Sequence, residues 1–495
     1  MQENNNFGFN FDNTYIDLPK SLYSEIDLNK VPNPKFIIFN DKLAKDLNLS
    51  SSSLQSKEGL EILAGNTKAK NGAYIAQAYG GHQFGHFSIL GDGRALLIGE
   101  HNVPGPIDIT LINSHKFDIQ LKGSGKTPYS RRGDGKAVLG PMLREYIISE
   151  AMYNLGIPTT RSLAVVKTGE KVYRETVKQG AILTRIATSH IRFGTFQYVA
   201  SILGKEALIQ LADYTIDRHY PYIKDNENKY LSLLEEVAKV HASLVAKWMS
   251  VGFIHGVMNT DNKTISGETI DYGPCAFMDT YNPATVFSSI DTYGRYAYKN
   301  QYNMAAWNLC RFAESLIPLI DEDSKTSIDL AQGIIHKFSS LYSQNYLREF
   351  KNKLGIFNSE ENDKELIQEL LDLMNKYKED FTNTFVSLTY KVNTDKGMFI
   401  SQEFSNWYEK YQQRLSRQSN SIEEVYNLMK NSNPVIIPRN HKVEEALSSA
   451  ENGDLSFMSN LLSALKNPYD RSENLKQYQE GQNPSCSHYR TYCGT

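Results

Sequence analysis

The sequence predicts an α+β protein built in two lobes, and three observations support this prediction. The 495 residues exceed the roughly 100–200 residues of one ordinary domain. Short strand-like runs bounded by glycine and polar turns dominate up to about residue 196, whereas helical periodicity dominates from about residue 198. The hydrophobic fraction of 40% and the aromatic fraction of 11% suffice for a large core and argue against disorder.

Composition also narrows the partners and the compartment. The net charge is −3, from 53 bases and 56 acids, so bulk charge indicates no nucleic-acid partner. Four cysteines, none in a C-x-x-C pair, are typical of a reducing compartment. The N-terminus lacks a signal-peptide pattern, and no apolar run approaches the roughly 18 residues needed to cross a bilayer. We therefore expect a cytoplasmic protein that contacts neither nucleic acid nor a membrane.

The first elements are short and carry no evident chemistry. Residues 36–39 are predicted to form a buried strand and residues 41–49 a helix, and the four serines at 50–53 a loop that could cap a helix. We expect residues 1–75 to be an N-terminal extension that packs on the small lobe.

A glycine-rich turn follows. Residues 87–90 and 95–100 are predicted to form a hairpin whose tip is Gly91-Asp-Gly-Arg94. Gly91 and Gly93 would let the backbone approach a ligand, and Arg94 adds a charge suited to phosphate. A simple hairpin turn explains the same residues equally well.

The next segment is a strand that ends on a lysine. Residues 117–122 alternate apolar and polar side chains up to Lys122, and a basic, glycine-rich loop follows at 123–136. A Walker A phosphate loop is excluded because position 120 is Gln120 rather than glycine and Pro128 opposes a following helix. Such a loop still suits phosphate through its backbone N–H groups and its basic side chains.

A helix over residues 141–155 carries Glu145 on its first turn and ends before Gly156. A strand lysine followed by a helix glutamate matches the small lobe of protein kinases, where the glutamate positions the lysine against nucleotide phosphates. The alternative is that Glu145 is an ordinary surface residue.

Two further strands are expected between residues 159 and 185, followed by the junction of the lobes. Arg185 and Arg192 lie there and could reach a triphosphate or be solvated edge charges. The large lobe is then helical, and a strongly amphipathic helix precedes the central loop. The expected helices are 233–248, 297–320, 325–350, 363–378, 403–414, 422–430, 442–450 and 455–465.

The central loop, residues 255–273, contains the candidate residues for proton transfer and metal binding. Asp261 and Asn262 are adjacent in a polar turn, and Asp271 follows before Tyr-Gly. The residues between Ile265 and Ile270 are predicted to form a small hairpin, which would bring Asn262 and Asp271 together. A carboxylate and an amide oxygen are suitable ligands for Mg²⁺, with nucleotide phosphates completing the coordination.

The kinase pattern H-x-D-x-x-x-x-N is broken in this loop. Its catalytic aspartate would stand at Val257, which cannot accept a proton. Either the site has a kinase shape without ordinary kinase chemistry, or Asp261 takes over as the base. An Asx-rich turn would explain Asp261 and Asn262 alone.

Long motifs now identify a family. The blocks A-Q-A-Y-G-G-H-Q-F-G, L-G-D-G-R-A, L-K-G-S-G-K-T-P-Y-S-R-R-G-D-G-K-A-V-L, L-G-I-P-T-T-R and H-G-V-M-N-T-D-N…D-Y-G-P closely resemble the selenoprotein O family (SelO, also called YdiU). The resemblance covers essentially the whole chain. It implies a protein-kinase-like two-lobed fold, that of a pseudokinase, with extra N-terminal and helical C-terminal segments.

The resemblance also implies the chemistry. Members of this family transfer AMP rather than phosphate, because ATP lies reversed in the pocket relative to a kinase. Asp261 would be the proton acceptor, Asn262 and Asp271 the ligands of Mg²⁺ (or Mn²⁺), and Glu145 the partner of Lys122. The implied ATP-binding residues are Gly91, Gly93, Arg94, Lys122, Asp134, Gly135, Arg185, Arg192 and Asp271.

The chain departs from the family in its cysteines. Many members carry a redox-active residue near the C-terminus that can bond a cysteine in the activation segment, and Cys493 matches the first position. The second position, near Phe287, holds no cysteine. Cys275 or Cys486 could substitute, and an unpaired thiol is the alternative.

The sequence therefore predicts a protein adenylyltransferase that attaches AMP from ATP to Ser, Thr or Tyr hydroxyls of proteins. The expected parts are a kinase-like N-lobe at 76–196, a helical C-lobe at 197–400, and a C-terminal helical segment with a cysteine-containing tail at 401–495. Two alternatives remain at this stage: a Mg²⁺-dependent kinase, and an ATP-binding scaffold without activity.

Overall fold

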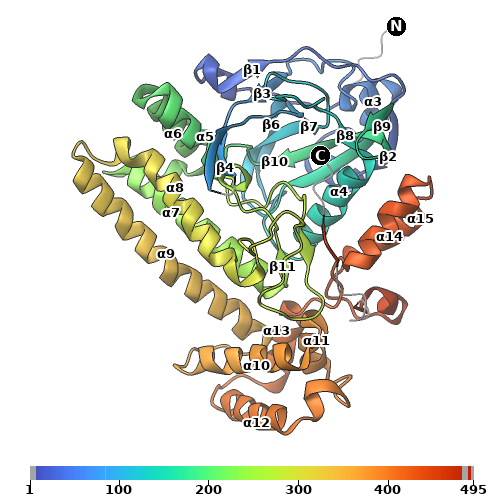
Figure 1. Ribbon diagram of the computed structural model, residues 1–495, viewed down its shortest axis with the longest axis vertical. Coiled ribbons are helices and arrows are strands. Elements are labelled where there is room, and N and C mark those ends of the chain that lie inside the picture. Colours follow the sequence, from blue (N-terminus) through green and yellow to red (C-terminus); the bar gives the residue numbers. More distant parts are fainter. Residues whose placement is uncertain (1–6, 84, 482–488, 492–495) are drawn as a thin grey trace.

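An antiparallel sheet of eight strands forms one part of the molecule, and helices form most of the rest (Figure 1). The computed structural model describes residues 7–83, 85–481 and 489–491. The strand order is β1-β3-β6-β7-β10-β9-β2, with β8 added beside β10. The bounds are β1 (Tyr23–Glu25), β2 (Lys35–Phe39), β3 (Ile75–Gln77), β6 (Ala95–Ile107), β7 (Ser114–Lys122), β8 (Ala137–Val138), β9 (Arg161–Tyr173) and β10 (Val177–Ala187).

The two faces of this sheet have different neighbours. In β7, Phe117, Ile119 and Leu121 belong to a core shared with the N-terminal helices, because alternate side chains of a strand point to opposite faces. These helices are α1 (Asp41–Asp46), α2 (Ser51–Leu54) and α3 (Lys57–Leu63). The opposite face carries Gln120 and Lys122 and is covered by α4 (Leu139–Asn154), which contacts β9 and β10.

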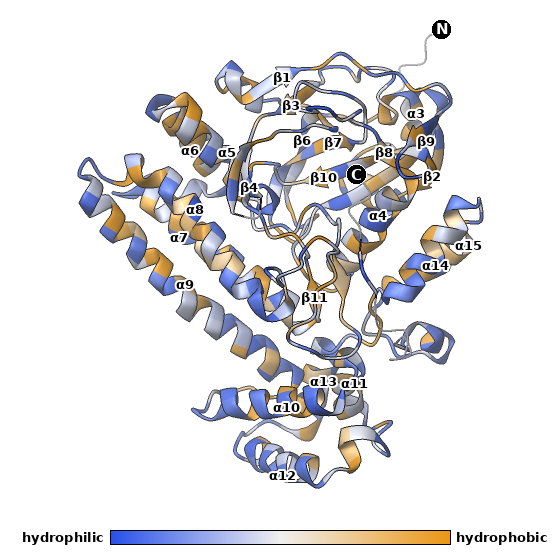
Figure 2. Ribbon diagram, viewed as in Figure 1, coloured by the Kyte–Doolittle hydropathy of each residue, from blue (hydrophilic) through white to orange (hydrophobic). Residues whose placement is uncertain are grey.

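The helical part begins at the end of β10. Its central helix α7 (Lys229–Ser250) packs against α8 (Gln301–Ile320) and α9 (Ser324–Lys353), and these three lie side by side in Figure 1. Hydrophilic and hydrophobic residues are mixed along α9 (Figure 2), and its buried Ala331, Ile334 and Phe338 recur at the spacing of one helix face. The remaining helices are α5 (Phe193–Tyr198), α6 (Lys205–His219), α10 (Asp363–Tyr377), α11 (Phe381–Tyr390), α12 (Gln402–Ser416), α13 (Ile422–Ser432), α14 (Asn440–Glu451) and α15 (Ser456–Leu465).

Most elements agree with the sequence-based expectations, including the strands 36–39 and 117–122 and the helix that carries Glu145. The serines at 50–53 do more than form a loop: Ser50 caps α2 through its side chain, which accepts from the Ser53 N–H. Helix α11 was not individually expected, because its threonines and aromatic residues are moderate helix formers.

The predicted hairpin with a Gly91–Arg94 tip is wrong. Strand β5 (His86–Ile89) pairs with β4 (Gly80–Gln83), whereas β6 pairs with β3 and β7. The chain therefore reverses between Gln83 and His86, and Gly91–Arg94 forms a kink in the returning arm, where Asp92 N–H donates to the Gln77 carbonyl.

The predicted hairpin between Ile265 and Ile270 is also wrong. Its two arms pair with other segments: Thr264 bridges to Arg192 and Thr269 bridges to Thr159. The Thr264 hydroxyl closes the loop by donating to the Glu268 carbonyl at 2.8 Å and accepting from the Glu268 N–H at 2.9 Å. A side chain thus replaces the backbone ladder that a hairpin would have used.

A search for membrane-spanning helices among the described residues found none of sufficient length and hydropathy.

Candidate active site

A cavity of about 860 Å³ lies between the sheet, α4 and the loop that runs from Val257 to Pro274. Every residue that the sequence singled out for nucleotide binding, metal binding or proton transfer lines it. These residues are Gly91, Gly93, Arg94, Lys122, Asp134, Gly135, Glu145, Arg185, Arg192, Asp261, Asn262 and Asp271. Nine bases and five acids line the cavity, so its lining favours a polyanionic ligand.

Asp271 is held by three cations. Its Oδ1 accepts from Lys122 Nζ at 2.8 Å and from an Arg185 guanidinium nitrogen at 2.7 Å, and its Oδ2 accepts from Arg192 at 2.6 Å. Although burial opposes the charge, these cations hold the pKa of Asp271 well below its usual range. The Asp271 backbone has φ = 60°, a conformation that non-glycine residues rarely adopt, so the loop holds this carboxylate against local strain.

The lysine–glutamate pair expected from the sequence is present. Lys122 Nζ donates to Glu145 Oε2 at 2.6 Å, and both side chains are buried. Arg185 extends the network by donating to Glu145 Oε1 at 3.2 Å and to Gln120 Oε1 at 2.6 Å. Glu145 is therefore no surface residue, and Arg185 is no solvated edge charge.

Asp261 is in the opposite state. No described residue forms a hydrogen bond to its enclosed Oδ1, and burial raises the pKa of Asp261 to about 6. Arg192 partly offsets the effect of burial through its charge, yet its hydrogen bond goes to the Asp261 backbone carbonyl at 2.5 Å. A carboxylate that titrates near neutral pH is suited to accepting a proton.

Asn262 lines the same cavity. Its side-chain nitrogen donates to the Val257 carbonyl at 3.0 Å, which fixes the orientation of the amide. The described residues contain no group of three His, Cys, Asp or Glu side chains arranged for a metal. Mg²⁺ commonly relies on one or two carboxylates together with substrate phosphates. Asn262, Asp271 and Asp261 carry amide and carboxylate oxygens, the donor type that Mg²⁺ prefers.

The kink at Gly91–Arg94 is held in place by Asp92, a residue that was not singled out from the sequence. Asp92 accepts from the Gln77 N–H at 3.1 Å and from the Gln120 side chain at 3.2 Å. A Cβ at Gly91, whose φ is 144°, would lie 2.4 Å from the Tyr129 ring, so only glycine fits. The sequence shows Asp92 only as an acid between two glycines, and neither its burial nor its partners could be read from that pattern.

The basic loop closes the outer wall of the cavity. Asp134 accepts from the Arg174 guanidinium at 2.9 and 3.0 Å, and its pKa is lowered, first by this hydrogen bond. Arg131 and Arg132 are exposed and line the cavity. Their exposure leaves these two cations available to an entering phosphate.

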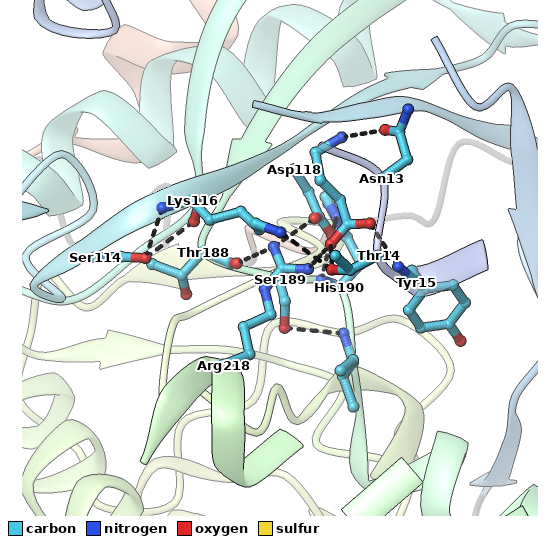
Figure 3. A network of polar contacts seen from close by, with 12 residues as sticks. Asn13, Thr14, Tyr15, Ser114, Lys116, Asp118, Thr188, Ser189, His190 and Arg218 are labelled. Carbon is cyan, nitrogen blue, oxygen red and sulfur yellow. Dashed lines mark hydrogen bonds and ion pairs between the residues drawn. The ribbon is translucent and has the colours of Figure 1, made fainter. Parts of the chain in front are cut away.

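A buried polar network joins Arg218 and Asp118 to residues 188–190 (Figure 3). The Arg218 guanidinium on α6 donates to Glu100, to Asp118 at 2.7 Å and to the Thr188 carbonyl at 2.6 Å. Asp118 also accepts from the His190 N–H at 2.8 Å, and burial lowers the pKa of His190 to about 4. This network fixes the backbone of residues 188–190, just before Arg192, and the sequence analysis did not identify it.

Of the three cysteines considered for a redox role, one lies among the described residues. Cys275 is buried and follows Pro274, which lines the cavity, whereas Cys486 and Cys493 lie outside the described residues. Near the expected activation-segment position, Phe287 contacts Tyr489, and Thr491 N–H donates to the Phe287 carbonyl at 2.8 Å. The C-terminal region thus reaches the segment in question through hydrogen bonds and ring packing.

Two comparisons with known proteins, one with a family model and one with individual proteins, agree with each other. A family model described as protein adenylyltransferase SelO matches residues 6–466. Proteins named protein nucleotidyltransferase YdiU are similar over nearly the full length of both chains. The one from Bacillus cytotoxicus is 57% identical over 489 residues, covering 99% of this chain and 98% of its own. The one from Bacillus mycoides is 58% identical over 496 residues and the one from Clostridium perfringens is 57% identical over 497, each covering 100% of both chains.

Proposed function

Because this chain belongs to the SelO family of protein adenylyltransferases and is thus a nucleotidyltransferase, we propose that it transfers AMP from ATP to Ser, Thr or Tyr hydroxyls of other proteins. Pyrophosphate is the second product. The observation that carries the proposal is the contrast within the cavity between Asp261, whose Oδ1 is unpaired and whose pKa is raised to about 6, and the cation-bound Asp271.

The reaction begins with the acceptor hydroxyl beside Asp261. The carboxylate takes the hydroxyl proton while the oxygen forms a bond to the α-phosphorus. The bond between the α-phosphorus and the bridging oxygen to the β-phosphorus breaks, and pyrophosphate leaves with that electron pair. Val257 stands where a kinase has its base, and Asp261 is the carboxylate that residues 257–262 contribute to the cavity.

The cations of the cavity provide the binding energy and the stabilisation of charge. Lys122, Arg185 and Arg192 are placed to exchange part of their contact with Asp271 for phosphate oxygens. The wall formed by Gly91, Gly93, Arg94 and the Asp134–Gly135 turn would hold the departing pyrophosphate. Asn262 and Asp271 would hold Mg²⁺ or Mn²⁺, which when bound neutralises charge that develops on the phosphates.

We extend the proposal to the architecture. A protein-kinase-like arrangement would place residues 76–196 in a small lobe and 197–400 in a large lobe. Residues 1–75 would form an extension on the small lobe and residues 401–495 a C-terminal segment. The Lys122–Glu145 pair and the presence of Asn262 and Asp271 in one cavity support this assignment.

Intact-mass analysis tests the proposal directly. Incubation of the protein with ATP, Mg²⁺ and a mixture of acceptor proteins should add about 329 Da per modification, the mass of an AMP group, rather than about 80 Da for phosphate. Label should follow α-labelled and not γ-labelled ATP. Transfer from the γ-position would contradict the proposal and identify a kinase, and the absence of any transfer would favour a scaffold.

A further inference from the structure

The loop that carries Asp261 is held by hydrogen bonds from several other elements. The Asn308 side chain on α8 donates to the Met258 carbonyl at 2.9 Å. The His82 N–H on β4 donates to Thr260 Oγ1 at 2.9 Å. The place of the proposed proton acceptor therefore depends on contacts that its neighbours in the chain make.

Asn259 is the loop residue between these two contacts. It is buried and lines the cavity, and its side-chain Oδ1 accepts from the Tyr296 hydroxyl at 2.5 Å. Its carbonyl oxygen accepts from the Asn262 N–H at 3.0 Å and so closes the turn that contains Asp261. Tyr296 thus holds the first residue of the turn that carries the proposed base and one proposed metal ligand.

A second contact fixes the direction of the hydrogen bond between Tyr296 and Asn259. Burial raises the pKa of Tyr296, and the charge and a hydrogen bond of the Arg295 side chain act against this effect. A guanidinium can only donate hydrogen bonds, so the Tyr296 oxygen accepts from Arg295 and its own proton is directed to Asn259. The Asn259 amide is therefore fixed with its oxygen toward Tyr296.

Tyr296 lies in the connection between β12 (Ala276–Phe277) and α8. The Asp291 carboxylate closes a turn in this connection, because it accepts from the Arg295 N–H at 2.9 Å and from the Tyr296 N–H at 2.8 Å. Ile290, directly before this turn, lines the cavity and is exposed. The turn of residues 291–296 thus joins an exposed part of the cavity lining to the loop that carries Asp261.

We propose that Tyr296 is a positioning residue for AMP transfer: its hydroxyl holds Asn259 and thereby keeps the Asp261 carboxylate in place for the acceptor hydroxyl. The inference rests on the proposed function, because Asp261 is the proton acceptor of that reaction. A displacement of about 1 Å in a reacting group can lower a rate about 100-fold, so the loss of one hydrogen bond behind the base is enough to slow the reaction. The alternative is that Asn259 only satisfies the buried hydroxyl of a core tyrosine.

Tyr298 offers a matched control for this alternative. It is buried like Tyr296, and its hydroxyl donates to the Met249 carbonyl on α7 at 2.6 Å. Met249 is not among the described residues that line the cavity. A change of either tyrosine to phenylalanine keeps the ring and removes one buried hydroxyl with its hydrogen bond. The difference between the two variants therefore isolates the contact with Asn259.

Steady-state kinetics with α-labelled ATP and an acceptor protein compare Tyr296→Phe, Tyr298→Phe and the wild type. We expect Tyr296→Phe to lower kcat about 10–100-fold while KM for ATP stays within about twofold. Tyr298→Phe should keep kcat within about twofold of the wild type, and both variants should lower the Tm to a similar extent. An unchanged kcat in Tyr296→Phe, or equal losses of kcat in the two variants, would overturn the proposal.

A double-mutant cycle tests whether Tyr296 acts through Asn259. Asn259→Ala breaks the same hydrogen bond from its other side, so it should lower kcat at least as much as Tyr296→Phe does. Tyr296→Phe added to Asn259→Ala should then lower kcat by less than about a further twofold. Losses that multiply independently would overturn the proposal. If Tyr296→Phe does not fold, Asn259→Ala alone decides, because a normal kcat in that variant contradicts the role of this hydrogen bond.

The same measurements separate this proposal from the proposed function. If the wild type adds about 329 Da to acceptors and Tyr296→Phe is equally fast, the positioning role fails while the proposed function stands. If the wild type adds about 80 Da instead, the proposed function fails, and the comparison of the two tyrosine variants on phosphate transfer still decides the role of Tyr296. If the wild type transfers neither group, both proposals fail.

Discussion

Asp261 and Asp271 lie in one loop and line one cavity, yet the protein keeps them in opposite electrostatic states. Asp271 accepts from three cations and its pKa is well below the usual range. Asp261 has an enclosed oxygen without a hydrogen-bond partner among the described residues, and burial raises its pKa to about 6. The difference lies in the neighbours, because both residues are largely removed from water.

This contrast separates two chemical roles. A carboxylate that stays ionised at every physiological pH is suited to hold cations, whether these are arginine, lysine or a metal. A carboxylate that exchanges its proton near neutral pH is suited to take one from a hydroxyl. Arg192 touches both residues, donating to the Asp271 carboxylate but only to the backbone of Asp261, and Lys122 and Arg185 bind the Asp271 carboxylate alone.

The largest expected effect is on catalysis. Asp261→Asn keeps the shape of the side chain and removes its basicity, so the rate of AMP transfer should fall by about 10²-fold or more, the scale of general-base catalysis. ATP affinity should change little, because the cations that bind phosphate are untouched. Single-turnover kinetics and equilibrium binding separate the two quantities. A variant with a normal rate would remove Asp261 from the reaction.

The next effect is on stability and has its origin in Asp271. Asp271→Asn takes the negative charge from a buried cluster of Lys122, Arg185 and Arg192, and the free energy of unfolding should fall by about 3–5 kcal/mol. Denaturant titration at pH 7 measures the change, with Asp134→Asn, which breaks an ion pair at the exposed end of the cavity, as the milder comparison. Equal losses for the two variants would mean that the buried cluster contributes no more to the free energy of unfolding than the exposed ion pair of Asp134.

The smallest effect is expected at Val257. If Asp261 serves as the base, the residue at the kinase position contributes only packing, and Val257→Ala should change kcat by no more than about twofold, far below the 10²-fold scale of a lost base. The variant is assayed beside Asp261→Asn under the same conditions. A loss comparable with that of Asp261→Asn would transfer the catalytic role to the Val257 position or its backbone.

Much of this site could be predicted from the sequence because its chemistry is encoded in residue types. Lys122 and Glu145 were recognisable from a strand and a helix of clear periodicity, and the structure pairs them at 2.6 Å. The helices and most strands followed from the same local patterns.

The parts that the sequence did not reveal depend on long-range pairing. Both predicted hairpins were wrong because each local turn signal was correct while the partner strand lay elsewhere, as for Thr264 and Arg192. The contacts among Arg218, Asp118, Thr188 and His190 join residues 30 to 100 positions apart, and no local pattern connects them. Likewise, Asp92 gave no sign that its partners would be Gln77 and Gln120.

The unfolding free energy of the wild type and of Asp261→Asn as a function of pH tests the contrast most directly. A carboxyl that titrates near 6 in the folded protein and near 3.8 when unfolded costs the folded state about 3 kcal/mol above pH 7. This cost disappears as the pH falls from about 6 toward 4, because the folded protein then takes up the proton first. The account predicts that Asp261→Asn is more stable than the wild type by about 1–3 kcal/mol at pH 8 and that the difference closes by about pH 4. A variant that is less stable at pH 8, or a difference that does not change with pH, would contradict it.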